Sequence, residues 1–430
     1  MDEPVMTQLL KLAGAILAII ITTFVIKLYR VRTFIRGLQK QGLPMPLHHW
    51  LLEHIPLSAS IISNLPPYAH GVYIGDQIRQ RYPHLDSAFY LDNWPLAAPI
   101  LVIKAFALTL KGDAWKYWRA IFNPGFSAGH VSSLVPRMIG GIKMFKELLR
   151  KHAESGKMIF LKDGSLHLTL DIIGRVAMNT TFRLLTDAII STRDHRFCSQ
   201  TSYNDMTGAL RRQLLWCTTG MNINLLEYIN ISRPFLHAYN SYKMNRYLSR
   251  ELDKRHRSIK GAEIQKKEKS IVDLALKAYL AENPSATGID KTFQNFAMAQ
   301  IKLFIFAGHD TTSAGAIFTY HLLSQHPNVL AKVRAEHTEV LGANIADTES
   351  VIASKPQLLN QLTYTTAVIK ESLRIYPTVA ALRDGQSYFS LIGDNSLRFP
   401  TDRTIVWGDH YATHHNPAYW PRAEEFLPER

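Results

Sequence analysis

The sequence predicts a mainly α-helical protein with a small β-sheet, preceded by one N-terminal transmembrane helix. Three observations support this fold class. A long uncharged segment lies near the N-terminus, two short strand-like runs follow it, and helical periodicity dominates from about Leu134 onward. No linker-like change in composition occurs after residue 46. We therefore expect an anchor with its basic flank over residues 1–41 and one folded domain over residues 42–430.

The composition is typical of a globular protein with a sizeable core. The chain has 430 residues, of which 47% are hydrophobic and 20% are charged. Its formal net charge of +14 favours acidic partners such as anionic lipid or an acidic protein surface. Nucleic acid is not an expected partner, because zinc-finger spacings and RNA-binding motifs are missing. Two cysteines, Cys198 and Cys217, imply no disulfide framework and fit a reducing compartment.

The first element is the predicted membrane anchor. Residues 12–26 contain no charge, and a helix over residues 5–26 would be about 33 Å long, enough to cross a bilayer core. A cleaved signal peptide, a buried core helix and an interfacial helix are alternatives. The acidic start, the basic flank and the lack of a polar face, respectively, count against them. The basic residues after the segment place the body in the cytosol. They are Lys27, Arg30, Arg32, Arg36 and Lys40.

The body begins after Gly42-Leu43-Pro44-Met45-Pro46, a stiff break that would separate the anchor from the folded part. Residues 89–92 and 100–103 are strand-like runs that indicate a small sheet. Helices are expected over residues 134–152, 166–182, 292–325, 329–341 and 361–376. The helix over residues 292–325 would be roughly 50 Å long, so it should run through the core.

A polar segment interrupts this long apolar helix. Gly308 would let a ligand approach the backbone closely, whereas Asp310 and Thr311 compete for backbone hydrogen bonds. A buried aspartate is costly unless it is paired or transfers protons. Two interpretations follow. The segment either holds a small polar ligand beside an acid and an alcohol, or it is a kinked core helix whose polar groups are satisfied.

Two further pairs of residues have spacings that bring them together on a helix. Glu371 and Arg374 are three residues apart and can form an ion pair, a pattern that is common on surface helices. Trp115 and Arg119 are four residues apart and could hold a carboxylate, or could pack as an amphipathic face. His410, His414 and His415 lack an acidic or thiolate partner at a recognisable spacing, so no metal site is predicted there.

Three motifs in this order resemble the cytochrome P450 family. They are Ala307-Gly308-His309-Asp310-Thr311-Thr312, Glu371-Ser372-Leu373-Arg374 and Pro428-Glu429-Arg430. The resemblance implies that Asp310 and Thr311 are the catalytic acid–alcohol pair that delivers protons to dioxygen. It also implies that Gly308 lies in the oxygen-binding groove and that Trp115, Arg119 and Arg383 bind the haem propionates. Glu371, Arg374 and Arg430 would form a structural network of the haem pocket.

Two departures from the family pattern lead to further expectations. The family holds its haem iron through a cysteine thiolate in a glycine-rich loop after Pro-Glu-Arg, so that cysteine is expected beyond Arg430 and no metal ligand is assigned within the sequence. The segment before Trp115, residues 104–114, is shorter than the helical insert usual in the family. We therefore expect an incomplete C-terminus and a shortened substrate-contact region, as in a mis-predicted gene model, a splice form or a decayed gene.

The resemblance implies a monooxygenase with haem b that inserts one oxygen atom from O2 into a lipophilic small molecule, in secondary metabolism. NADPH-cytochrome P450 reductase would supply electrons. The protein would be a single-pass protein of the endoplasmic reticulum membrane, in contact with membrane lipid, whose body faces the cytosol. Two alternatives remain: a catalytically inactive truncated relic, and an anchored protein that binds a hydrophobic ligand.

Overall fold

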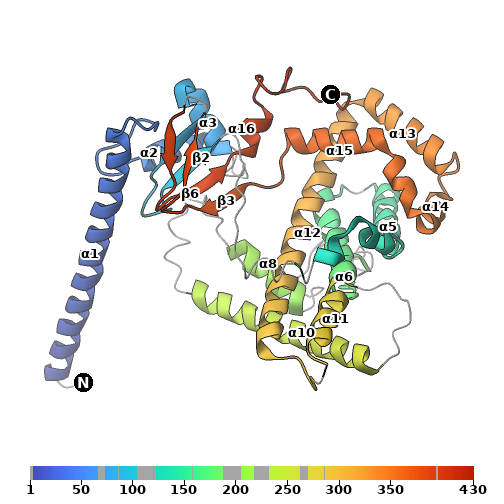
Figure 1. Cartoon of the computed structure of the whole chain (residues 1–430), viewed down its shortest axis with the longest axis horizontal. Coiled ribbons are helices and arrows are strands. Elements are labelled where there is room, and N and C mark those ends of the chain that lie inside the picture. The colour runs from blue at the N-terminus through green and yellow to red at the C-terminus, as the bar shows by residue number, and fades with distance from the viewer. Residues whose placement is uncertain are drawn as a thin grey trace. The chain divides into compact units, whose positions relative to one another are not determined.

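The computed structural model describes residues 3–65, 73–85, 87–103, 120, 123–156, 158–186, 205–216, 232–261, 270–284, 286–393 and 396–430. The chain forms two compact units (Figure 1). Unit 1 comprises Met1–Ala107, Thr218–Ile229 and Val379–Ala423, and unit 2 comprises Leu108–Cys217, Asn230–Thr378 and Glu424–Arg430. The mainly helical fold with a small sheet and an N-terminal apolar helix, as predicted from the sequence, is confirmed.

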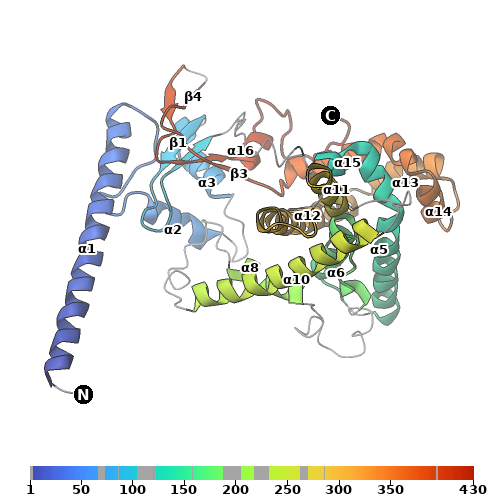
Figure 2. The same ribbon diagram turned by 60° about the horizontal axis from the view of Figure 1, so that its bottom comes forward.

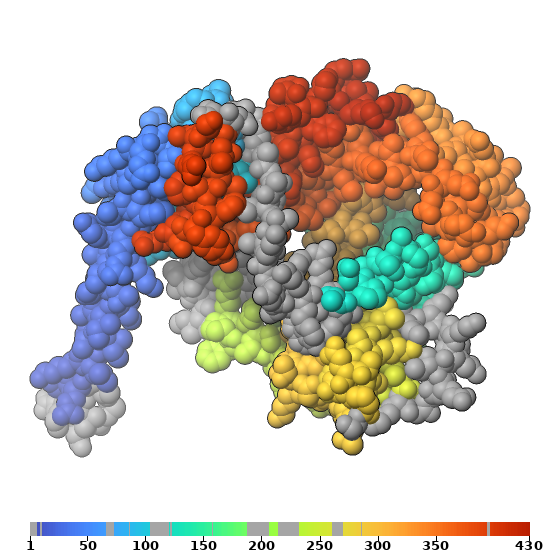
Figure 3. All heavy atoms as spheres, viewed as in Figure 1, coloured from blue at the N-terminus to red at the C-terminus, as the bar shows by residue number. Residues whose placement is uncertain are grey.

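Unit 1 begins with the long helix α1, Glu3–Lys40. Among the described residues this helix alone is long and apolar enough to cross a membrane, and its apolar half is exposed. That half extends away from the rest of unit 1 (Figure 3). The C-terminal end differs, because Ile35 and Leu38 are buried against unit 1. α1 is one continuous helix, as both ribbon views show (Figure 2).

The segment after α1 packs against the sheet and does not form a free hinge. Leu43 is buried, and the carbonyl of Pro44 accepts a hydrogen bond from the backbone N–H of Tyr90 at 3.0 Å. The proline-rich break predicted from the sequence therefore ends the helix and also lies along the first strand. As a result, α1 and the sheet belong to one unit.

The sheet of unit 1 has the strand order β1-β2-β6-β3. Its strands are β1 (Ala88–Leu91), β2 (Ile100–Ile103), β6 (Ile405–Gly408) and β3 (Ala381–Asp384). β2 pairs with β1 in the antiparallel and with β6 in the parallel sense. Every residue of β1 and β2 is buried, as continuous apolar runs require. A hairpin of β4 (Ser390–Ile392) and β5 (Arg398–Pro400) lies outside this sheet, and the helices are α2 (Ile55–Asn64), α3 (Tyr73–Arg81) and α16 (His410–His414).

Unit 2 is helical. Its elements are α5 (Ala128–Ser155), α6 (Leu161–Met178), α8 (Asp205–Trp216), α10 (Arg233–Gly261), α11 (Ile271–Glu282), α12 (Lys291–Gln325), α13 (Pro327–Leu341), α14 (Thr348–Ser354) and α15 (Thr363–Ile375), with the short 3-10 helices η2 (Asn123–Phe126) and η4 (Pro356–Gln361). The longest predicted helix, residues 292–325, corresponds to α12. Asp290 caps its N-terminus by accepting a hydrogen bond from Phe293 N–H at 2.9 Å.

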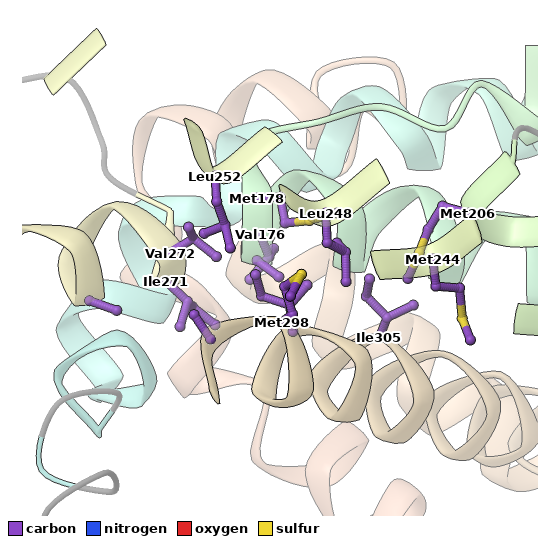
Figure 4. Packing of buried hydrophobic residues seen from close by; sticks show 14 of the residues in the cluster. Val176, Met178, Met206, Met244, Leu248, Leu252, Ile271, Val272, Met298 and Ile305 are labelled. Atoms are coloured by element: carbon purple, nitrogen blue, oxygen red, sulfur yellow. The ribbon is translucent and has the colours of Figure 1, made fainter. Parts of the chain in front are cut away.

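The largest core of unit 2 forms where α12 packs with α6, α8, α10 and α11. Figure 4 shows residues of this cluster, in which Met298 and Ile305 of α12 meet side chains of the other helices. Those side chains include Val176, Leu248 and Ile271. The N-terminal part of α12, from Phe293 to Ile305, is thus fixed on one face by an apolar contact that leads up to the polar segment at Gly308–Thr311.

Candidate functional site

The polar segment lies within an unbroken α12, so the helix is not interrupted at the glycine. The hydroxyl of Thr311 donates a hydrogen bond to the carbonyl of Ala307 at 2.7 Å. Such bonding to the residue four positions earlier satisfies the hydroxyl while the helix stays intact. His309, to which the sequence assigned no role, is buried, and its ring Nδ1 lies 2.7 Å from the carbonyl of Ile305.

Gly308 lies at the contact between α12 and α6. A Cβ atom at this position would lie 2.9 Å from Cδ1 and 3.1 Å from Cγ1 of Ile173. Real Cβ atoms essentially never come so close to a neighbour, so the small residue allows the two helices to approach. The sequence predicted that this glycine leaves space for a ligand. In the structure, Ile173 occupies the side of Gly308 on which a Cβ would lie.

Asp310 is exposed, although its apolar neighbours in the sequence suggested that it would be buried. The free-energy cost of burying a carboxylate therefore does not arise here. It shares a helix face with exposed apolar side chains, because Phe306 precedes it by four residues and Leu303 by seven. Leu303 is 51% exposed and Phe306 is 42% exposed. This face of α12 thus offers apolar surface next to a carboxylate.

Glu371 is the centre of a buried ion-pair network. Its Oε2 accepts a hydrogen bond from Arg374 Nε at 2.9 Å, and its Oε1 accepts from Arg374 Nη2 at 2.9 Å, Arg430 Nε at 3.0 Å and Leu427 N at 3.1 Å. Burial alone raises the pKa of Glu371, but the hydrogen bonds from Arg374, Leu427 and Arg430 outweigh it and hold the pKa below its ordinary value. The structure thus brings Glu371, Arg374 and Arg430 together.

Both arginines of this network also donate to one backbone carbonyl of the C-terminal segment. Arg374 Nη2 donates to the carbonyl of Glu425 at 3.1 Å, and Arg430 Nη2 donates to the same carbonyl at 3.2 Å. Glu429 continues the contact, because its Oε1 accepts from Lys332 Nζ and from the hydroxyl of Tyr364, each at 2.7 Å. The Pro-Glu-Arg segment is therefore fastened to α13 and α15.

A second carboxylate, Glu336 of α13, holds the start of α15 and was missed in the sequence. It accepts hydrogen bonds from the backbone N–H groups of Tyr364 at 2.6 Å and Thr365 at 2.8 Å. The sequence carries one signal of this contact: Leu362 occupies the N-cap position of α15 and has no capping side chain. A helix that begins without its own cap needs an acceptor from elsewhere in the chain.

The remaining predicted residues divide into two groups. Arg383 belongs to β3 of unit 1, is half-buried, and donates from Nη1 to the carbonyl of Leu382 at 2.8 Å. Trp115, Arg119, Cys198 and Cys217 lie outside the described residues. Within the part of the chain that the structure describes, no cluster of three or more histidine, cysteine or acidic side chains could hold a metal ion.

The described residues offer a surface that suits the haem ring, but they contain no cysteine that could bind its iron. The exposed apolar face with Leu303 and Phe306 on α12 suits a flat apolar group, and the carboxylate of Asp310 lies on the same face. An axial thiolate requires a cysteine, and neither cysteine lies in a described range.

Comparisons with known proteins identify the family. The model of the family "Cytochrome P450" matches residues 88–430. Cytochrome P450 monooxygenase polC of Polytolypa hystricis is 41% identical, over 99% of this chain and 79% of the relative. Cytochrome P450 monooxygenase acrF of Aspergillus aculeatus is 33% identical, over 82% of this chain and 73% of the relative. A crystal structure of a cytochrome P450 (CYP102L1) superposes with a TM-score of 0.64 at 20% identity, over 90% of this chain and 83% of that one. The chain belongs to the cytochrome P450 family.

Proposed function

We propose that this protein is a membrane-anchored haem monooxygenase that inserts one oxygen atom from O2 into a lipophilic small molecule. Family membership supports the reaction class, and two fungal relatives are named as monooxygenases. The observation that carries the proposal for this chain is the face of α12, where an exposed carboxylate and a hydroxyl lie beside apolar side chains. Fungal secondary metabolism is the proposed setting, in line with the origin of these relatives.

The proposed roles of the residues follow from their positions. Haem b, when bound, supplies the redox chemistry that activates oxygen. Leu303 and Phe306 would exclude water from the apolar face of α12. Asp310, at the exposed surface of the helix, would exchange protons with solvent, and Thr311 would hold a proton at Oγ1 through its hydrogen bond to Ala307.

The cofactor-holding roles are proposed from the family pattern. Trp115, Arg119 and Arg383 would bind the haem propionates, and Gly308 would keep α12 close to its neighbours in the groove. Glu371, Arg374 and Arg430 would have a structural role, which their buried hydrogen bonds support. We assign no residue of the sequence as the iron ligand.

We further propose that residues 1–41 anchor the protein in the endoplasmic reticulum membrane and that residues 42–430 face the cytosol. The exposed apolar half of α1 supports anchoring, and the basic residues after Ile26 support this orientation. NADPH-cytochrome P450 reductase is the proposed electron donor. The net charge of +14 suits docking onto an acidic partner.

The decisive test is the absorption spectrum of the protein purified from its native source. A Soret band that shifts on reduction and carbon monoxide binding, as a thiolate-bound haem does, is the expected result. A featureless spectrum together with cooperative unfolding would contradict the enzyme and favour a protein that binds a hydrophobic ligand. A featureless spectrum without a cooperative transition would favour an inactive relic.

A further inference from the structure

Lys302 of α12 is a half-buried cation without a counter-charge. Its Nζ donates a hydrogen bond to Oδ1 of Asn245 on α10 at 2.9 Å. Within the part of the chain that the structure describes, no acidic side chain pairs with Lys302. Burial lowers the pKa of Lys302 from its ordinary value of 10.5, and no neighbouring acid offsets this effect. An ammonium removed from water in this way is costly unless an anion joins it.

The packing of α10 against α12 does not require this charge. The two helices share an apolar contact around Met298 and Ile305 (Figure 4). A second polar contact between them is neutral, because Gln294 Nε2 donates a hydrogen bond to Ser249 Oγ at 3.0 Å. Since a neutral pair of side chains is enough to join the helices there, the ammonium of Lys302 is available for another role.

Lys302 and Asn245 together offer hydrogen-bond donors to an anion. An ammonium has three donors and no acceptor, and among the described residues only Asn245 accepts from it. Because lysine can only donate, the amide oxygen of Asn245 must face it, and the amide Nδ2 is turned away. This Nδ2 has no hydrogen-bond partner in the described ranges. The pair can therefore hold a carboxylate by charge-assisted hydrogen bonds.

This pair borders the apolar face of α12. Phe306 follows Lys302 by four residues, so their side chains lie on the same side of the helix. Leu303 and Phe306 are both exposed there. Thr311 follows Lys302 by nine residues, which is about 13–14 Å along the helix axis. A long apolar molecule whose acid end lies at Lys302 would thus extend along this face to the level of the threonine.

We propose that Lys302 and Asn245 bind a carboxylate of the substrate, so that the substrate is a lipophilic acid. The inference rests on the proposed monooxygenase function and names its substrate class. The apolar body of the acid lies along Leu303 and Phe306. The separation between Lys302 and Thr311 then determines which carbon reaches the reaction site, at roughly 13 Å from the carboxylate.

The test measures the binding of two probes that differ in charge, dansylaminoundecanoic acid and its methyl ester. It uses the full chain purified with its haem, and dansyl fluorescence reports binding without turnover. Lys302→Met removes the ammonium and keeps an apolar stem, whereas Lys302→Arg keeps a cation. Asn245→Asp places a carboxylate next to Lys302 and so occupies the site from within. Lys291→Met is the matched control, because Lys291 is exposed at the start of the same helix.

We expect the affinity for the acid to fall by about tenfold or more in Lys302→Met and in Asn245→Asp, because each loses a charge-assisted hydrogen bond to the probe. The affinity for the ester should stay the same in both variants. Lys302→Arg and Lys291→Met should bind both probes as the parent does. Each probe is compared among proteins in the same detergent, so its partitioning into micelles cancels.

Three other results would decide differently. An equal loss of acid and ester binding in Lys302→Met overturns the inference, because the lysine then only supports the fold. Unchanged acid binding in Lys302→Met, in a protein whose reduced carbon monoxide spectrum shows thiolate-bound haem, overturns this inference alone. A loss confined to the acid, in a protein without that spectrum, supports the carboxylate site and overturns the proposed monooxygenase.

Discussion

Arg430 donates a hydrogen bond through Nε to Oε1 of Glu371 at 3.0 Å, although 59 residues separate the two in sequence. The same Oε1 accepts hydrogen bonds from Arg374 and from the backbone N–H of Leu427. Two guanidinium groups therefore share one buried carboxylate. Because Arg430 belongs to the Pro-Glu-Arg segment and Glu371 to α15, this carboxylate determines where the segment lies in unit 2.

Replacing Glu371 with glutamine should destabilise unit 2 severely. The change keeps the size of the side chain but leaves two arginines next to a neutral group, and removing one partner of a buried pair costs about 3–5 kcal/mol. The measurement is the free energy of unfolding in urea, followed by far-UV circular dichroism. Glu339→Gln on α13 is the control, because Glu339 is exposed. A loss in Glu371→Gln no larger than in this control would contradict the network.

The same carboxylate should make unit 2 sensitive to acid. The pKa of Glu371 is lower in the folded protein than its ordinary value of 4.5, because the hydrogen bonds of the arginines and Leu427 N–H outweigh the effect of burial. Its contribution to stability is therefore complete above pH 4.5 and is lost as the pH falls through the folded pKa. We expect the difference in unfolding free energy between the parent and Glu371→Gln to shrink from pH 7 to pH 3. A difference that does not depend on pH would contradict the shift.

Gly308→Ala should separate packing from ligand binding at this glycine. The added methyl group would press on Ile173, and overpacking of about 1–3 kcal/mol is offset in part by the better helix propensity of alanine, about 1 kcal/mol. In an Ile173→Ala background the same change should be neutral or stabilising. A double-mutant cycle of unfolding free energies measures this coupling. Gly129→Ala on α5 is the control, because a Cβ there meets nothing within 4 Å.

Local contacts were predictable from the sequence, and contacts between distant elements were not. The three-residue spacing of Glu371 and Arg374 indicates their ion pair, and the apolar run at Ile100–Ile103 indicates a buried strand. Asp310 was expected to be buried because its neighbours in the sequence are apolar, but it is exposed. The periodicity of a helix indicates that one face is apolar. It does not indicate whether another element covers that face.

Three features of the structure depend on how elements pack and have little trace in the sequence. Arg32 looked like part of a basic membrane flank, and it is buried against Asp92, which lies 60 residues away. Glu336 caps α15 from another helix. Gly308 is recognisable as a position without a side chain, but only the placement of α6 reveals that Ile173 fills the space.

Removing the hydroxyl of Thr311 should reduce the proposed activity. Thr311→Val keeps the shape of the side chain but cannot hold a proton at this position, so product formed per NADPH consumed should fall by about tenfold or more. Thr311→Ser keeps the hydroxyl and should retain most of the yield. The measurement is the ratio of product to NADPH for the haem-loaded enzyme. Equal yields from the valine and serine variants would contradict the role of the hydroxyl.

His54 should make unit 1 lose stability in mild acid. Its ring is buried between two backbone groups: Nδ1 accepts from Asp92 N–H at 2.9 Å, and Nε2 lies 3.2 Å from the carbonyl of Pro46. This arrangement fits a neutral ring that donates from Nε2. Burial lowers the pKa of His54 from 6.5 to about 4. The unfolded chain thus binds a proton between pH 6.5 and 4 that the folded chain does not, so stability falls across this range by about 3 kcal/mol.

Thermal unfolding at pH 7 and pH 4.5 measures the effect. In His54→Gln the pH-dependent part of the loss should disappear, while the exposed His84→Gln should keep it. If the decline between the two pH values is the same in His54→Gln as in the parent, the decline has another source.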